Sequence, residues 1–384
     1  MRLALFSLLI LLSGCQGNSD SANIKATKSI PDVKTREELK SLADSAFAAE
    51  MPEGEPGGAY MVAYNGRILF AESFGLQVNS SKVPVSLNTN FRVAAVSMQF
   101  TALAALTLVD EGKLSLGDPV NEILGITSMP GVKVGHLIHH TSGIPSYESY
   151  FVNDWKGGVI PTNKDVLQWY AENGKPKFQP GTEFEFSNGG YNLLATVVEK
   201  ASGMDFMVYA NKAVFEPAGM KTSTYYSLSQ PVPVQNQAFG YTRNNGEWMQ
   251  TDGNKLNGLV GEDGVYTSIN NYFLYDLALR RKTILSESVH DFVFERGTEK
   301  IPNFPGTLDF INLDEVYYGK GWFLSNDIAF HSGKWQGTSA LTIRELNRPL
   351  TIAIFRNTGN DSDHLANYLY ALVNSYFENW DDVE

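Results

Sequence analysis

The stretch that decides the fold of this chain is FRVAAVSMQFTA, residues 91–102. The run that overlaps and follows it, TALAALTLVDEGKLSL, has the apolar spacing of a helix and predicts a helix end near Gly112. Ala95 and Met98 are three residues apart and share one face of the start of this helix, whereas Ser97 points away from that face. The shared face therefore carries neither a nucleophile nor a group that can hold a proton.

The first residues, MRLALFSLLILLSGCQ, are typical of a secretory signal. A cation at Arg2 precedes an apolar run that is too short to span a bilayer, and small residues follow before Cys15. The tetrad LSGC resembles the lipobox of bacterial lipoproteins, which implies cleavage before Cys15 and acylation of its thiol and amine. The resemblance predicts a lipid-anchored protein of the bacterial cell envelope that faces the periplasm. Gln16 weakly favours the outer membrane, and a signal anchor with a chance cysteine is the alternative.

Composition bounds what the mature protein can do. Cys15 is the only cysteine, which excludes a disulfide, a thiolate nucleophile and a cysteine metal site in the mature domain. The formal net charge of −12 argues against nucleic acid as a partner. With 384 residues, 43% of them hydrophobic, the chain can bury the core of one large domain or of two adjoining lobes.

Local signals predict the order of helices and strands. Thr35 and Glu38 form a capping box that begins an amphipathic helix, TREELKSLADSAFAAEM. Two apolar runs around Asn65-Gly66 are typical of a β-hairpin. Near the other end, WFLSNDIAFHSGKW, GTSALTIRE and LTIAIFRNTG are three successive strand candidates, and SDHLANYLYALVNSYFENW is a last helix.

Strands at both ends with helices between them predict an α/β fold of the α+β type. We expect one antiparallel sheet, built from the N- and C-terminal strands and flanked by helices, and an inserted, mostly helical lobe with a ligand cleft where the lobes meet. The expected boundaries are a signal peptide at 1–14, a tether at 15–34 and a domain at 35–378, with the α/β lobe at about 35–90 and 258–378 and the helical lobe at about 91–257.

Seven stretches in order carry a family resemblance: FRVAAVSMQFTA, LVDEGKLSLGDPV, HLIHHTSGIPSYE, FQPGTEFEFSNGGYNLLATVVEKASGM, FEPAGMKTS, GEDGVYTSINNYFLYDLAL, and YGKGWFL with FHSGKWQG. From about residue 40 to 375 the chain resembles the serine β-lactamase and penicillin-binding-protein superfamily, in particular its class C-like branch. The resemblance implies a β-lactamase/transpeptidase-like fold and the chemistry of acyl transfer, without a cofactor or a metal.

The same resemblance implies that the reactive groups are missing. Its S-x-x-K motif places Ala95 at the serine nucleophile and Met98 at the lysine. Its Y-x-N motif places Phe186 at the tyrosine and retains Asn188. Each replacement removes the reactive group and roughly keeps the shape, so no residue is expected to be catalytic. Ser97 would need a lysine at position 100 to act as a substitute nucleophile, and Phe100 occupies that position.

The H-x-G motif of the family is retained as His331 and Gly333, on what we expect to be an edge strand. The family's oxyanion hole uses backbone N–H groups, which here would belong to Ala95 and Lys334. A side-chain change does not remove a backbone donor, so a carbonyl or carboxylate could still bind there. The candidate ligand-cleft residues are therefore Ala95, Asn188, His331, Gly333 and Lys334; for the Lys334 side chain an exposed surface position is the alternative.

Two acidic and three basic side chains have competing interpretations. Glu262 and Asp263 are expected to form a turn with a solvated glutamate, and a relocated general base is the alternative. His136, His139 and His140 have metal-like spacing, but they match a structural motif of the family and are expected in the core or in loops.

Three functions follow as hypotheses. The first is a catalytically silent binder of a peptide, a peptidoglycan fragment or a protein partner, held on the membrane through Cys15. The second is a hydrolase (esterase, peptidase or β-lactamase-like) whose chemistry has moved to Glu262, His331 or Lys334. The third is a structural envelope protein whose cleft has no role.

Overall fold

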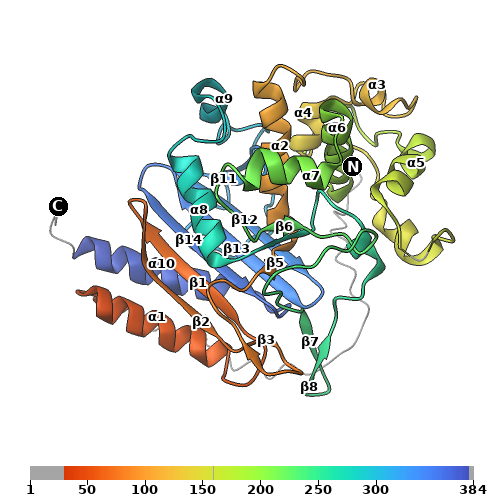
Figure 1. The fold of residues 1–384 in the computed structure, drawn as a ribbon. Coiled ribbons are helices and arrows are strands. Elements are labelled where there is room, and N and C mark those ends of the chain that lie inside the picture. The colour runs from red at the N-terminus through yellow and green to blue at the C-terminus, as the bar shows by residue number, and fades with distance from the viewer. Residues whose placement is uncertain (1–29, 159, 380–384) are drawn as a thin grey trace, which may run out of the picture.

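The computed structural model describes residues 30–158 and 160–379. Within them, a seven-stranded antiparallel sheet has the strand order β10-β11-β12-β13-β14-β1-β2. Its strands come from both ends of the chain, which confirms the predicted fold class (Figure 1). They are β1 (Gly58–Tyr64), β2 (Arg67–Phe74), β10 (Val316–Tyr318), β11 (Phe323–Ser325), β12 (Ile328–Trp335), β13 (Thr338–Glu345) and β14 (Leu350–Arg356).

Two terminal helices, α1 (Arg36–Glu50) and α10 (Asp363–Glu378), pack on each other along one face of the sheet (Figure 1). Thr35 caps α1 as predicted, because its Oγ1 accepts from the backbone N–H of Glu38 at 3.1 Å. Asn65 and Gly66 form the predicted hairpin turn, with φ angles of 49° and 72°. The helix α8 (Ile269–Arg280) packs against β1 and β14 from the other face.

The segment between β2 and β10 holds the remaining helices and three small sheets (Figure 1). The helices are η1 (Ala94–Val96), α2 (Ser97–Asp110), α3 (Val120–Leu124), α4 (Val134–Ile138), η2 (Tyr150–Asp154), α5 (Asn163–Asn173), α6 (Asn188–Ser202), α7 (Phe206–Ala210), η3 (Asn211–Phe215), η4 (Lys255–Gly258) and α9 (Glu287–Asp291). The strands are β3 (Leu76–Val78), β4 (Val83–Pro84), β5 (Phe91–Arg92), β6 (Thr224–Tyr225), β7 (Tyr241–Asn244), β8 (Glu247–Gln250) and β9 (Val265–Thr267).

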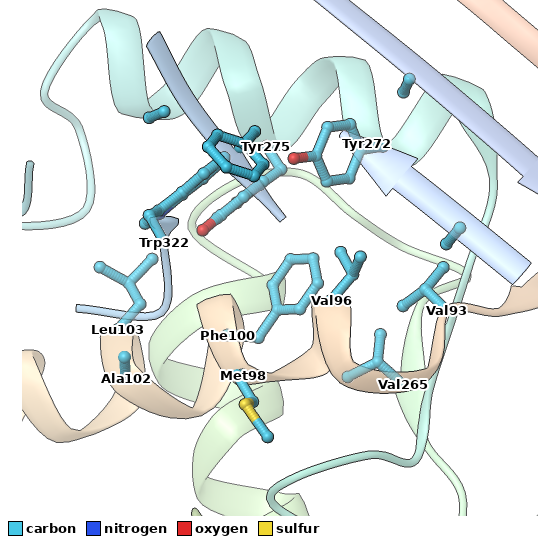
Figure 2. Close-up of a cluster of buried hydrophobic side chains, with 14 of the residues drawn as sticks. Val93, Val96, Met98, Phe100, Ala102, Leu103, Val265, Tyr272, Tyr275 and Trp322 are labelled. Atoms are coloured by element: carbon cyan, nitrogen blue, oxygen red, sulfur yellow. The ribbon is translucent and has the colours of Figure 1, made fainter. Parts of the chain in front are cut away.

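The helix α2 is the central element of the core, and every residue from Ser97 to Leu108 is buried. It packs against α6. The ring of Phe100 lies 4.6 Å from that of Tyr275 on α8, and Met98 leaves the helix on another side (Figure 2). A helix that is buried all round fixes the position of its start, and Ala95 lies in η1, directly before it.

Two sequence expectations need correction. The tether was expected to reach residue 34, but Val33 is fully buried and its N–H donates to Ser375 Oγ on α10 at 3.0 Å. The domain therefore begins earlier, because an apolar side chain in this segment has a place in the core. The candidate WFLSNDIAFHSGKW is two strands, β11 and β12, since Asn326 takes a left-handed turn conformation with φ of 51°.

No helix among the described residues is long and apolar enough to cross a membrane. The predicted signal peptide and Cys15 lie outside the described residues.

Candidate functional site

The chain makes a sharp turn immediately before Ala95. The strand β5 ends at Arg92, and Ala94 then has a φ of 47°, in the left-handed region that disfavours any residue with a side chain. Such a conformation costs about 1–3 kcal/mol and is characteristic of functional sites. Ala95, the residue predicted at the nucleophile position, follows it at the start of η1 and α2 and is partly exposed.

Gly333 on β12 lies against this turn. A Cβ atom at position 333 would be 2.4 Å from Val93 O and 2.8 Å from Ala95 N, closer than real Cβ contacts allow. A glycine is therefore required where the strand passes the start of α2. The structure thus brings together two residues, Ala95 and Gly333, that are far apart in the sequence.

The second half of β12 has an open side. Two-residue loops connect β11 to β12 and β12 to β13, and loops of this kind close with a residue pair that exchanges backbone hydrogen bonds. Trp335 and Thr338 form such a pair, so the N–H and C=O groups of Trp335 point toward β13. Backbone groups alternate in direction along a strand, so the N–H and C=O groups of Ser332 and Lys334 point away from β13. Because β11 pairs only with residues 328–330, these groups have no strand partner in the described sheet.

This arrangement corrects the expected edge strand. β12 lies inside the sheet along its first half, and only the part around Lys334 is an edge. The backbone N–H of Ala95 donates no hydrogen bond within the described residues. The free N–H of Ala95 thus lies beside the part of β12 whose N–H groups have no strand partner. N–H donors placed together in this way can bind a carbonyl or carboxylate oxygen.

Met98 lies beneath this surface in a buried polar cluster. Its side chain is fully buried, and its Sδ is 3.8 Å from the hydroxyl oxygen of Tyr318. His331 Nδ1 lies 2.8 Å from the carbonyl oxygen of Ser332, so Nδ1 carries the proton and Nε2 accepts from the Tyr318 hydroxyl at 3.2 Å. Burial lowers the pKa of His331 to about 4, and the ring is neutral at pH 7.

Phe186 packs on the other side of this cluster. Its ring centroid is 4.3 Å from that of His140, which is itself 4.5 Å from the ring of Tyr318. His140 is fully buried, and its Nδ1 accepts from the backbone N–H of Ser187 at 3.1 Å. Burial holds the pKa of His140 well below its usual value. Phe186, at the position predicted for a tyrosine, therefore presents an apolar ring to this cluster.

Asn188 and Lys334 lie at the rim and do not join the cluster. The amide of Asn188 donates to Glu148 at 2.9 Å, at the start of α6. The side chain of Lys334 is exposed to solvent. Of the predicted ligand-cleft residues, the structure therefore brings Ala95 and Gly333 into contact, places Lys334 next to them along β12, and buries His331.

The expectation for Glu262 was wrong. It was expected to be solvated, but its side chain is buried, accepts a hydrogen bond from the Tyr147 hydroxyl, and is 3.3 Å from Asn192 Nδ2. Burial raises the pKa of this carboxyl to about 7. The physical reason is that Gly261 and Gly264, with φ of 118° and 108°, let the turn fold its glutamate inward.

Asp263 points to the opposite side of the same turn. It forms an ion pair with Arg92, whose guanidinium is 3.0 Å away and whose side chain is only 2% exposed. Arg92 is the last residue of β5, so the ion pair attaches the turn before Ala95 to the turn after Gly261. A buried guanidinium needs such a partner, because an unpaired buried charge is costly.

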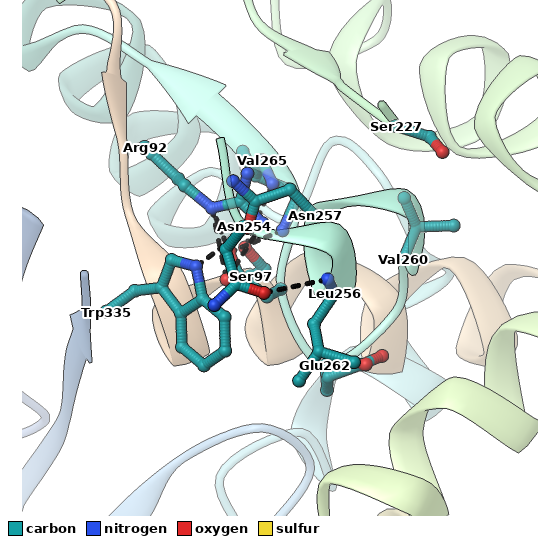
Figure 3. Close-up of polar contacts among 12 residues, drawn as sticks. Arg92, Ser97, Ser227, Asn254, Leu256, Asn257, Val260, Glu262, Val265 and Trp335 are labelled. Atoms are coloured by element: carbon teal, nitrogen blue, oxygen red, sulfur yellow. Dashed lines mark hydrogen bonds and ion pairs between the residues drawn. The ribbon is translucent and has the colours of Figure 1, made fainter. Parts of the chain in front are cut away.

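Ser97 has a structural role. Its Oγ accepts from the backbone N–H of Val265 at 3.1 Å and its side chain is fully buried (Figure 3). At the end of β12, Trp335 Nε1 donates to Asn257 Oδ1 at 2.7 Å and ties the strand to η4.

The three histidines with metal-like spacing lie in different environments. His136 accepts from the backbone N–H of Lys133 and caps α4, His139 packs against Gly297, and His140 lies in the buried cluster. Among the described residues, no group of three or more His, Cys, Asp or Glu side chains is placed to hold a metal ion.

Met98, Tyr318 and His331 are all buried. Two open pockets of about 580 and 740 Å³ in the described part of the chain are lined by other residues, and none of the predicted site residues lines either of them. The candidate site is therefore a surface formed by Ala95, Phe186 and the open side of β12, with a packed floor of Met98, Tyr318 and His331. Sequence reasoning missed Tyr318, although it belongs to the quoted stretch YGKGWFL.

Comparison with known proteins identifies the family of the chain. Residues 43–375 match the model of the Beta-lactamase family. The chain belongs to the Beta-lactamase family. Penicillin-binding protein 4* of Bacillus subtilis (strain 168) is 30% identical over 323 residues, which are 80% of this chain and 69% of that relative.

Two solved structures are similar in fold over most of the chain. The octameric penicillin-binding protein homologue from Pyrococcus abyssi has a TM-score of 0.74 at 25% identity and covers 88% of this chain and 77% of its own. FmtA from Staphylococcus aureus has a TM-score of 0.74 at 16% identity, over 90% of both chains, which is a likeness of the fold alone.

Proposed function

We propose that this chain is an envelope-anchored member of the Beta-lactamase family that binds a peptide, a peptidoglycan fragment or a protein partner without transferring an acyl group. The observation that carries the proposal is the free backbone N–H of Ala95 beside the open side of β12, at a place where the side chains offer no nucleophile.

Binding is supported by the backbone donors. A carbonyl or carboxylate oxygen of the ligand would accept from the N–H of Ala95 and from the N–H of Lys334. An extended peptide would pair with the open side of β12, as in recognition by strand addition. The exposed amine of Lys334 lies beside this segment and would attract a carboxylate.

Absence of turnover is supported by the side chains. Ala95 has no oxygen that could attack, Met98 is a fully buried thioether, and Phe186 has no hydroxyl. In serine hydrolases, loss of a nucleophile or base lowers the rate by about 10⁴–10⁶-fold, and these losses do not add. Backbone donors and binding alone retain about 10³–10⁴-fold over water. An acyl-enzyme should not accumulate.

The test is the intact mass of the protein after incubation with a reactive penicillin, with an A95S/M98K/F186Y variant beside it. We expect no adduct on the natural sequence and an adduct on the variant. An M98K/F186Y variant, which lacks the serine, is the matched control and should remain unmodified. An adduct on the natural sequence would overturn the proposal, and peptide mapping would then identify the nucleophile.

Ligand binding needs a separate measurement. Titration with a D-Ala-D-Ala peptide and with a soluble peptidoglycan fragment should shift backbone amide resonances of Ala95 and Lys334. A proline at Lys334, K334P, removes one donor and should abolish the shifts, whereas K334A keeps the donor and should retain them. Resonances that stay unchanged at millimolar ligand would leave a structural role as the better interpretation.

A second candidate is a hydrolase with relocated chemistry, and the pKa of Glu262 favours it, because a general base works best when its pKa lies near the operating pH. No hydrogen bond connects Glu262, His331 and Lys334 in the described residues. Ester hydrolysis that survives purification and disappears in E262Q would support this candidate over the first.

The anchor is proposed from the sequence alone. In membrane fractions of a bacterial host, the natural protein should sediment with the envelope, and a C15S variant should lose the mass of the acyl chains. A C15S variant whose mass differs only by the substitution would show that Cys15 is not acylated.

A further inference from the structure

The part of β12 that follows its pairing with β11 consists of residues 331–335, and we refer to it as the open segment. Because side chains alternate along a strand, those of His331 and Trp335 point to the face on which Gly333 lies against the start of α2. A peptide strand paired with the open segment would alternate in the same way, so that every second side chain of the peptide would meet this face.

An aromatic ring lies at the first end of the open segment. Phe186 is partly exposed, and its ring centroid is 6.5 Å from that of His331. The same ring stacks with Phe323 of β11, with centroids 6.3 Å apart and an angle of 13° between the planes. A ligand side chain placed opposite His331 would therefore meet apolar aromatic surface.

A second aromatic ring lies at the other end. Trp335 is partly exposed, and its Nε1 donates to Asn257 Oδ1 at 2.7 Å (Figure 3). Asn257 is itself 2% exposed and donates to the carbonyl oxygen of Asp252 at 2.7 Å, so the indole is held in one orientation. Because His331 and Trp335 are four positions apart on one strand, the two ends are about 13 Å from each other.

The middle of this face has no room for a large side chain. Gly333 lies so close to the turn at Ala95 that even its own Cβ atom would press on the backbone of that turn. A ligand residue opposite Gly333 would extend its side chain toward the same turn. Only a small residue therefore fits at this position of the ligand.

The opposite face of the open segment is polar. Ser332 and Lys334 point to it, and both are exposed. Opposite charges on directly paired residues of neighbouring strands attract each other. An acidic ligand residue is therefore favoured opposite Lys334.

We propose that the ligand of this site is an extended protein segment of five residues, with large apolar side chains at its first and fifth positions, a small residue at the third and an acidic residue opposite Lys334. The inference rests on the proposed function and narrows its three classes of ligand to one. A peptide that ends in D-Ala-D-Ala has only methyl groups at its end and would leave both rings without a contact.

The test is calorimetric titration of the full chain with two capped pentapeptides of equal composition. Acetyl-Phe-Asp-Ala-Asp-Phe-amide has its phenylalanines four positions apart, and its residue order is the same in both directions, so it suits parallel and antiparallel pairing alike. Acetyl-Asp-Phe-Ala-Phe-Asp-amide has the same residues with the phenylalanines two positions apart. No register of this second peptide gives each of the two rings a phenylalanine.

We expect the first peptide to bind about tenfold more tightly than the second, because only the first contacts both Phe186 and Trp335. W335A removes one of the two rings and should weaken binding of the first peptide about tenfold. W248A is the matched control, because Trp248 is also partly exposed and its Nε1 also donates to a side chain, that of Glu55. W248A should bind the first peptide as the natural protein does.

Equal binding of the two peptides to the natural protein overturns the inference, and this comparison needs no variant to fold. Unchanged binding of the first peptide to a folded W335A also overturns it. If neither pentapeptide binds while a D-Ala-D-Ala peptide shifts the amides of Ala95 and Lys334, the inference is wrong and the proposed function stands. If none of these ligands binds at millimolar concentration, both are wrong.

Discussion

Gly333 lies so close to Ala95 that a Cβ atom at position 333 would be 2.8 Å from Ala95 N. The strand β12 thus passes the start of α2 with only backbone between them. The N–H of Ala95 and the unpaired N–H groups of β12 can therefore donate to one ligand oxygen. This binding needs no reactive side chain at Ala95 or at Gly333.

We expect G333A to destabilise the fold by about 1–3 kcal/mol, because the added methyl must displace the first turn of α2 or the strand. Urea unfolding measures this free energy. S332A, one residue away and exposed, is the control and should stay within about 0.5 kcal/mol of the natural protein. Equal stability of the two variants would mean that the close approach does not exist in solution.

Met98→Lys restores the predicted lysine without its partners. Because the site is fully buried and its polar contact is the neutral Tyr318 hydroxyl, we expect M98K to lose several kcal/mol of stability at pH 7. Burial lowers the pKa of such a lysine in the folded state, so the loss should shrink as the pH rises toward 10. M98L, which keeps volume without charge, should lose less than about 1.5 kcal/mol. A pH-independent loss in M98K would contradict this explanation.

Acid should weaken the fold through His331. Its pKa is about 4 in the folded protein, against an ordinary value of 6.5, because burial disfavours the charged ring. The unfolded chain therefore binds this proton first, and stability falls as the pH drops from about 6.5 and levels off below about 4. The full effect is on the order of 3 kcal/mol. The buried His139 and His140 act in the same direction.

Unfolding of H331Q at pH 7 and pH 5 isolates the share of His331, because the amide oxygen of glutamine can still accept from Tyr318. The decrease between these two pH values should be smaller in H331Q than in the natural protein. An identical decrease would assign the acid sensitivity to the other histidines whose pKa burial lowers, namely His136, His139, His140 and His290.

Glu262 should have the opposite pH dependence. Its carboxyl has a pKa of about 7 in the folded protein, against an ordinary value of 4.5, so the folded state holds the proton longer. Stability should therefore fall as the pH rises from about 4.5 to above 7. E262Q carries no charge, and we expect it to exceed the natural protein by about 1–3 kcal/mol at pH 8 and to match it at pH 5.

The hydrogen bonds around position 262 are compatible with this change. In E262Q the amide oxygen of the new side chain would accept from Tyr147. The Oδ1 of Asn192 would accept from the new amide after a flip of its side chain, which gives up the hydrogen bond from Asn192 to the carbonyl oxygen of Val260, an oxygen that Asn163 still donates to. If E262Q is less stable than the natural protein at pH 8, the ionised carboxylate of Glu262 stabilises the fold in a way that the neutral amide does not replace.

Most of the fold could be predicted because its signals are local. The Thr35 cap, the Asn65-Gly66 turn and the periodicity of α2 depend on residues within a few positions of one another. The split of β11 from β12 was missed because Asn326-Asp327 is a weaker turn signal than Asn-Gly. The docking of Val33 was missed because one apolar residue in a polar segment carries no pattern.

The sequence by itself determined the family fold and the residue types at positions 95, 98 and 186, since these depend on letters in a fixed order. Only the tertiary structure decided the environments. It placed Met98 against Tyr318, 220 residues away, and buried Glu262 on Tyr147, 115 residues away. Burial and charge pairing arise between segments that meet only after folding, so no local pattern encodes them.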